Sequence, residues 1–263
     1  MPILRIAPDE TPIRPAVEPV GRCAASADQH AYRSALEYKQ HFQIIPASED
    51  ALRHHCYRIR HEVYCRELGY EPTNQAGMEF DEHDEYSLHC LIRATHTNQF
   101  VGCARLVVAD PGNPGIKLPF LTACAGTLAP GVDEFIHQNR HRVAEVSRVA
   151  VIPPYRRGKT DFKVSASHAK PSGRHRLPHL TLGLYLAMTA LARQRGIQHL
   201  FFLIDRNMAT SLEHQGWDMR QVGEPIEHNG HRIPYLVSLE HNIKRMSPFI
   251  RHFYEAIQRD VLV

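Results

Sequence analysis

The chain has no run of about 18 apolar residues, the length that a membrane-spanning helix requires, so the sequence predicts no transmembrane segment. Its first 25 residues contain five prolines and three acids, and they lack the apolar stretch of a secretory signal. We therefore expect a cytoplasmic protein.

Paired cysteines and metal-binding spacings are also missing. The six cysteines include no C-x-x-C pair, and the 19 histidines include no H-E-x-x-H motif. In a reducing compartment such cysteines remain free thiols, and several are buried as small hydrophobic residues. The sequence thus predicts free thiols and no metal site.

The net charge is only +3, but the charges are unevenly distributed along the chain. Residues 62–85 contain eight acids and one base, whereas residues 140–176 contain ten bases and two acids. A basic segment of this kind attracts anions. A site for nucleic acid would interleave aromatic residues with the bases, and this segment offers only Tyr155 and Phe162, so no nucleic-acid partner is predicted.

Apolar spacing and turn residues predict alternating strands and helices. A helix with an N-cap at Ser48 is expected to end at Gly69. The other expected elements are strands at 41–46, 87–95, 100–109, 143–152 and 199–205, a helix at 178–196, a short helix ending at 216, a hairpin within 221–239 and a last helix from 247. This order favours one α/β domain (an α+β sandwich) with a mixed sheet covered by helices.

Three segments fall outside this pattern. Residues 1–40 are proline-rich and show no clear period, so we expect a partly ordered N-terminal arm. Residues 110–140 are predicted to be a long connection, and residues 156–178 a basic loop. The expected organisation is an arm at 1–40, a single domain at 41–242 and a helical extension at 243–263.

Four motifs follow one another along the first half of the domain. They are YRIRHEVYCRELGY at 57–70, GMEFDEHD at 77–84, VGCARL at 101–106 and EVSRVAV at 145–151. In sequence and in order these motifs resemble those of the acyl-homoserine-lactone synthases, which are GNAT-type enzymes. The resemblance implies a GNAT-like, mostly antiparallel sheet flanked by helices.

Two further motifs lie downstream, LGLYLAM at 182–188 and HNGHRIPY at 228–235. They are similar to the acyltransferases associated with exosortase and PEP-CTERM protein sorting, a group related to the N-acyl amino acid synthases. The resemblance implies an N-acyltransferase. Such an enzyme would move a long-chain fatty acyl group from a thioester carrier to the amine of an amino acid or a similar small acceptor.

The resemblance to these families also places six charged residues in one substrate-binding cluster beside a cleft: Arg60, Asp81, Asp84, Arg105, Glu145 and Arg148. For Arg60, Asp84 and Arg105, locking the first helix onto the sheet is the competing role. Glu145, with Ser147 and Arg148 beside it, is the predicted catalytic group. Its carboxylate would accept the proton that an ammonium group loses before attacking a thioester. Pairing with an arginine and guidance of the ammonium are the alternatives.

By the same resemblance, a bulge in the strand 143–152 would expose a backbone N–H between Val149 and Val151 to the reaction's oxyanion. Ser147 would bond near the acyl carbonyl, and Tyr64 would form a wall of the acceptor pocket. A thiol leaving group, with a pKa of about 8.5, needs little help, so no serine or cysteine nucleophile is required. The acyl chain is expected to run along four residues that are otherwise ordinary core: Val149, Leu184, Met188 and Phe202.

The basic loop is the predicted binding site for the donor. The residues expected to hold a phosphopantetheine arm are Arg156, Arg157, Lys159 and Lys163. The loop only partly matches the Q/R-x-x-G-x-G/A pattern of acetyl-CoA-dependent relatives. This departure favours acyl carrier protein over CoA as the carrier of the acyl-phosphopantetheine thioester, with no bound cofactor. A solvated loop without a ligand is the alternative.

Two other functions compete with this hypothesis. One is an acyl-homoserine-lactone synthase that uses S-adenosylmethionine, and the other is a non-catalytic module that binds a carrier protein or nucleic acid. Tyr64 and Tyr70 stand where the lactone synthases have Phe and Trp, and the chain extends beyond Tyr235. Both features favour an amino acid acceptor.

Overall fold

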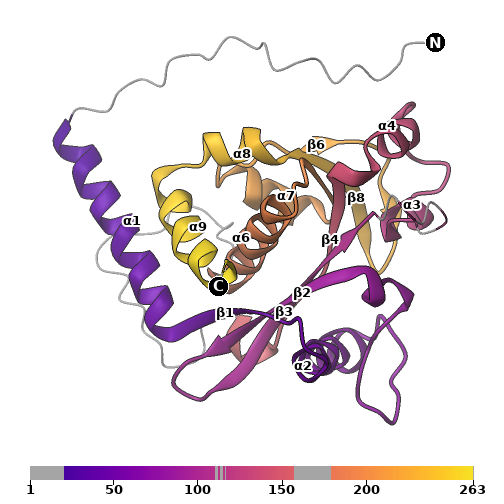
Figure 1. Cartoon of the computed structure of the whole chain (residues 1–263), viewed down its shortest axis with the longest axis horizontal. Helices are drawn as coiled ribbons and strands as arrows, with labels where there is room; N and C mark the ends of the chain where they lie inside the picture. Colours follow the sequence, from indigo (N-terminus) through magenta and orange to yellow (C-terminus); the bar gives the residue numbers. More distant parts are fainter. Residues whose placement is uncertain (1–20, 110–111, 113–114, 116, 157–178, 263) are drawn as a thin grey trace.

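The computed structural model describes residues 21–109, 112, 115, 117–156 and 179–262. A single sheet forms its centre, with strand order β1-β2-β3-β4-β5-β8-β6 and β7 paired to β8 (Figure 1). β4 and β5 are parallel, and the other paired strands are antiparallel. The strands are β1 (Phe42–Pro46), β2 (Ser87–Ala94), β3 (Gln99–Val108), β4 (Val143–Val151), β5 (His199–Ile204), β6 (Arg220–Gln221), β7 (Ile226–Glu227) and β8 (His231–Ser238). The predicted mixed, mostly antiparallel sheet is confirmed.

Helices cover both faces of the sheet (Figure 1). Along β2, Cys90 and Ile92 pack into one core with α6 and α9, whereas Leu91 between them packs into another core with α2. This alternation follows from the two-residue period of a strand. The helices are α1 (Gly21–His41), α2 (Asp50–Arg60), α3 (Pro119–Ala123), α4 (Val132–Gln138), α5 (Pro153–Arg156), α6 (His179–Gln194), α7 (Arg206–Glu213), α8 (Leu239–Arg245) and α9 (Pro248–Val261).

Much of the segment expected to be an arm is a helix. α1 lies against α9, and it buries Ala31, Ala35 and Tyr38, spaced four and three residues apart. The sequence pattern hid this face because two of its members are small, while Tyr32 and Leu36 beside them are large, apolar and exposed. Residues 1–20 lie outside the described part of the chain.

The helix predicted to end at Gly69 is present but changes type along its length. Glu49, not Ser48, occupies the N-cap, and it makes no side-chain capping bond. After Arg60 the backbone continues as a π-helical segment, η1 (His61–Glu67), in which Leu68 N–H donates to Val63 O at 3.0 Å. π-helical segments are rare in proteins, and those that occur often lie at functional sites. Gly69 then takes a left-handed φ of +64° and ends the helix.

The connection predicted at 110–140 contains two short helices, α3 and α4. They form because apolar residues of the connection cover the far part of the sheet. Phe120 stacks on Phe201 of β5, and Val132 and Ile136 are buried beside them. α3 thereby comes to lie next to the start of β4.

Candidate active site

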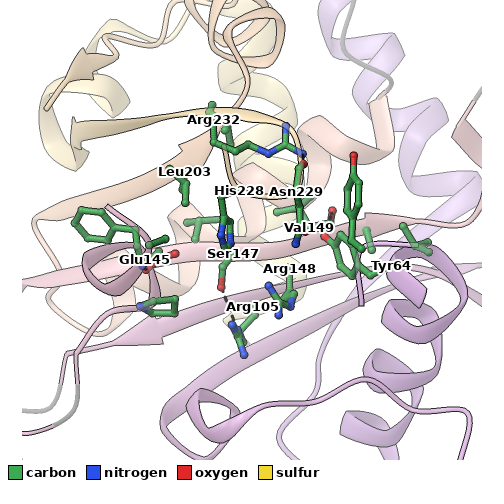
Figure 2. Close-up of a pocket in the computed structure, with 18 of the residues that line it drawn as sticks. Tyr64, Arg105, Glu145, Ser147, Arg148, Val149, Leu203, His228, Asn229 and Arg232 are labelled. Atoms are coloured by element: carbon green, nitrogen blue, oxygen red, sulfur yellow. Dashed lines mark hydrogen bonds between the residues drawn. The ribbon is translucent and has the colours of Figure 1, made fainter. Parts of the chain in front are cut away.

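A cavity of 840 Å³ opens between two strands that separate partway along the sheet. β4 and β5 pair over residues 143–146 and 199–202, but β4 continues to Val151 and β5 to Ile204 without further pairing between them. The side chains of β4 line one wall, and the turn between β7 and β8 lies across from it (Figure 2). The volume falls in the range of small-molecule sites.

The predicted bulge in β4 is present beside this cavity. Arg105 of β3 pairs with Ser147, but Cys103 pairs with Ala150, so β4 holds an extra residue at positions 148–149. Arg148 takes a positive φ of +50° there. The hydroxyl of Tyr64, from η1, donates to the carbonyl oxygen of Val149 at 2.9 Å and so ties this bulge to the first helix.

Tyr64→Phe should keep the ring and remove this one hydrogen bond. We expect a loss of about 1 kcal/mol in the free energy of unfolding, measured by urea titration. A variant as stable as the parent would show that the hydroxyl does not hold the bulge.

Beneath the cavity, Arg60 and Arg105 are buried to 1% exposure and share Asp84. The Nη1 atoms of the two arginines lie 2.6 Å and 3.1 Å from Asp84 Oδ1. Arg105 also donates to Asp81 Oδ1 at 2.5 Å and to Ser147 Oγ at 3.0 Å. Asp81, Arg105 and Ser147 line the cavity, but Arg60 and Asp84 do not. Arg60 and Asp84 thus lie outside the cavity lining, and their ion pair joins α2 to the turn that carries Asp84; we propose the locking role for both.

Because of Asp81 and Asp84, the free energy of unfolding should depend on pH. The neighbouring arginines, against the effect of burial, lower the pKa of Asp81 to about 2 and also lower that of Asp84. A lowered folded-state pKa gives stability that is present above the unfolded-state pKa and is lost as the pH falls. The free energy of unfolding should therefore drop between about pH 4 and pH 2. Asp81→Asn should flatten this drop, and an unchanged slope would contradict the assignment.

Glu79 and Glu71 complete the ion network, and the sequence analysis assigned neither of them. Arg148 donates to Glu79 Oε1 at 3.2 Å and to Glu71 Oε1 at 3.1 Å, and Glu79 also pairs with Arg60. Glu79 is the acid of the Gly77-Met-Glu sequence, so the motif itself held the signal. Its reach to Arg148, 69 residues away, could be seen only in three dimensions.

Glu145 lies beside the ion network and not within it. Its Oε2 accepts a hydrogen bond from Phe120 N–H of α3 at 2.9 Å, and the described residues include no ion pair to it. The side chain is 3% exposed, and this burial raises its pKa to about 7. The expected cluster of three carboxylates and three guanidiniums is thus corrected, with Glu79 in the position expected for Glu145. Glu145 still lines the same cavity as Ser147 and Arg148.

The remaining predicted site residues either line the cavity, lie in the core or fall outside the described residues. Val149, Val151 and Tyr64 line the cavity, whereas Leu184, Met188 and Phe202 are buried core and do not. Arg156 also lines the cavity and pairs with Glu67. Arg157, Lys159 and Lys163 lie outside the described residues.

Three cavity residues from the β7–β8 hairpin were not predicted as site residues. His228, Asn229 and Arg232 lie across the cavity from β4 (Figure 2). A hairpin within 221–239 and a motif at 228–235 were expected from the sequence, but neither indicates that this turn faces β4. Their position depends on β8 pairing with β5.

The described residues lack two further features. No helix there is long and apolar enough to cross a membrane. Nor does this part of the chain contain a group of three or more His, Cys, Asp or Glu side chains placed to hold a metal ion.

The known proteins that this chain resembles are acyltransferases and acyl synthases. Residues 59–164 match the model of the acetyltransferase (GNAT) domain. An acyl-homoserine-lactone synthase from Pseudomonas fluorescens is 34% identical over 85 residues, which are 31% of this chain and 43% of that protein. The matched region therefore spans less than half of that relative.

Two solved structures extend the likeness beyond the matched region. The CoA-dependent acyl-homoserine lactone synthase BjaI, solved with SAM and isopentyl-CoA, has a TM-score of 0.53 at 18% identity and covers 84% of this chain and 89% of its own. FeeM, an N-acyl amino acid synthase from uncultured soil microbes, has a TM-score of 0.51 at 14% identity and covers 78% and 94%. Residues 59–164 therefore resemble a GNAT domain, and the chain has the fold shared by these two synthases.

Proposed function

We propose that the chain is an N-acyltransferase that moves a long-chain fatty acyl group from a thioester carrier to the amine of an amino acid or a similar small acceptor. The observation that carries this proposal is Glu145, a buried carboxyl with a pKa of about 7 that lines the cavity beside the bulged strand β4. A general base is most effective when its pKa is near the working pH. The GNAT domain and the two kinds of synthase with this fold support the same chemistry.

The reaction is a direct transfer in one ternary complex. The amine nitrogen attacks the thioester carbonyl, Glu145 takes the proton that the amine loses, and the tetrahedral intermediate places its negative oxygen near the backbone of residues 149–151. The C–S bond then breaks, the new C–N bond remains, and the sulfur leaves as a thiolate. The leaving thiolate takes up the proton that Glu145 received from the amine.

For the donor we propose acyl carrier protein ahead of acyl-CoA. The proposal rests on the basic composition of residues 156–176, of which Arg156 reaches the cavity. The CoA-dependent synthase with this fold keeps acyl-CoA as the competing donor. If a carrier protein docks on these bases, raising the salt from 50 to 500 mM should raise KM for acyl carrier protein steeply, roughly tenfold or more. A flat response would remove the carrier-protein proposal.

The second candidate is an acyl-homoserine-lactone synthase. The BjaI structure with SAM and the match to the Pseudomonas fluorescens synthase favour it. Tyr64 and Tyr70 replace the aromatic residues that the lactone-synthase resemblance implies, and Tyr64 binds the bulge through its hydroxyl. We therefore rank the amino acid acceptor first.

One experiment separates these candidates. The purified chain is incubated with acyl carrier protein or CoA thioesters and a panel of amino acids plus S-adenosylmethionine, and the products are identified by mass. We expect N-acyl amino acids. Acyl lactones would select the second candidate, and an absence of any acylated product from folded protein would rule out both.

Two wider assignments remain proposals. The cytoplasm is the compartment that best suits free thiols, and Cys56, Cys65, Cys90, Cys103 and Cys124 are all free and buried. A role beside an exosortase system rests on the motifs at 182–188 and 228–235 alone.

A further inference from the structure

The turn between β7 and β8 is held in a conformation that directs polar groups at the cavity. Asn229 and Gly230 both have positive φ, +52° and +91°, within the three-residue loop that joins Glu227 to His231. His228 N–H donates to Gly230 O at 2.9 Å across this turn. The His228 ring points from the hairpin toward Ser147 on the opposite wall, and Arg232 lies above it in this view (Figure 2).

Arg232 has fewer carboxylate partners than Arg105 and Arg148, the arginines of β3 and β4 that line the cavity. Arg105 is paired with two carboxylates and Arg148 with three. Among the described residues, Arg232 makes one ion pair, from Nη1 to Asp205 Oδ2 at 3.3 Å, and its Nη2 donates to Asn229 O at 2.8 Å. Asp205 is 41% exposed, and its Oδ1 accepts the Met208 N–H at the start of α7. Arg232 therefore keeps more of its attraction for an anion.

The opposite part of the cavity suits a positive group. Glu145 of β4 lines it, and the described residues include no ion pair to this carboxylate. His228 is held neutral, since burial and the nearby Arg148 lower its pKa, so it offers a single N–H donor and no second charge. The cavity thus presents the Glu145 carboxyl on β4 and the Arg232 guanidinium on β8.

We propose that Arg232, assisted by His228, binds the carboxylate of the acceptor, so that the acceptor is an α-amino acid and not a simple amine. This inference rests on the proposed N-acyltransferase function. An α-amino acid carries its amine and its carboxylate on one carbon, so a carboxylate bound at Arg232 fixes where the amine lies. Its carboxylate reaches the hairpin while its amine faces Glu145 and the acyl thioester.

The test compares an amino acid acceptor with its carboxamide, in the parent chain and in Arg232→Gln. A charged hydrogen bond contributes about 1.5–3 kcal/mol, so the parent should prefer the acid by roughly 10–150-fold in kcat/KM. Arg232→Gln should raise KM for the acid by a similar factor, leave KM for the acyl thioester within about twofold, and bring the acid-to-amide ratio near one. Arg232→Lys should restore part of the preference.

The control is Arg220→Gln, an exposed arginine of β6 outside the cavity, which should behave like the parent. Thermal unfolding of each variant checks that it is folded. Binding of the amino acid, measured without the acyl thioester, tests the role of Arg232 even in a variant that turns over slowly. Equal use of acid and amide by the parent, or unchanged discrimination in Arg232→Gln, would overturn the inference and leave the N-acyltransferase intact. An absence of N-acyl product from every acceptor would instead overturn the function beneath it.

Discussion

Replacing Glu145 by Gln is expected to lower kcat/KM for N-acylation by about 10²–10⁴-fold, the range that a general base contributes. Gln keeps the size of the side chain and an oxygen that accepts the Phe120 N–H, but it cannot take a proton. In the parent, kcat/KM should rise with pH to an inflection near the Glu145 pKa of about 7. That inflection should be absent from the Gln variant, as measured with saturating thioester across pH 5–9.

A stability measurement separates this loss from misfolding. Burial raises the folded-state pKa of Glu145 from 4.5 to about 7. A raised carboxyl pKa gives stability that is present below the unfolded-state value and is lost as the pH rises through the folded-state value. At pH 8 the Gln variant should therefore be more stable than the parent, by up to about 3 kcal/mol, and at pH 4 the two should be equal. A variant that is less stable at pH 8 would show that the carboxylate is held by a cation.

Asp84→Ala should produce the largest loss of stability. It leaves the buried guanidiniums of Arg60 and Arg105, each 1% exposed, without the carboxylate that they share. Removing one partner from a buried ion pair costs about 3–5 kcal/mol. For a chain of this size that corresponds to a fall in Tm of roughly 6–20 °C, measured by calorimetry.

The matched control is Glu62→Ala. Glu62 is 47% exposed and pairs with Arg66 one helical turn away. Exposed pairs of this kind contribute at most about 0.5 kcal/mol. Equal losses of Tm in the two variants would mean that the ion network under the cavity does not hold the first helix and the sheet together.

Elements with a complete local pattern could be predicted from the sequence. β2 and β3 are largely apolar runs on either side of a turn and pair as expected, and α6 begins and ends within two residues of its predicted bounds. α1 could not be predicted, because its buried face is made of alanines and one tyrosine and gains meaning only from contact with α9. α3 escaped prediction for the same reason, since Phe120 is apolar without any period around it.

The site shows the same division. The bulge in β4 and the arginines of the network were expected from motifs, since each motif lies on one element. The partners across the network could not be assigned, because Glu79 reaches Arg148 only once the loop folds over β4. Arg232 was missed because its place at the cavity depends on the order of strands in the sheet, which no single segment records.

The central claim is that an acyl thioester and an amine meet in the cavity between β4 and β5 and react directly. The most direct measurement mixes the chain with an acyl thioester, then with an ¹⁵N-labelled amino acid, and follows the intact protein mass and the small products through one turnover. We predict an unchanged protein mass throughout, with labelled N-acyl amino acid and free thiol released in equal amounts. A protein that gains the mass of one acyl group before product forms would contradict direct transfer and require a nucleophile on the chain.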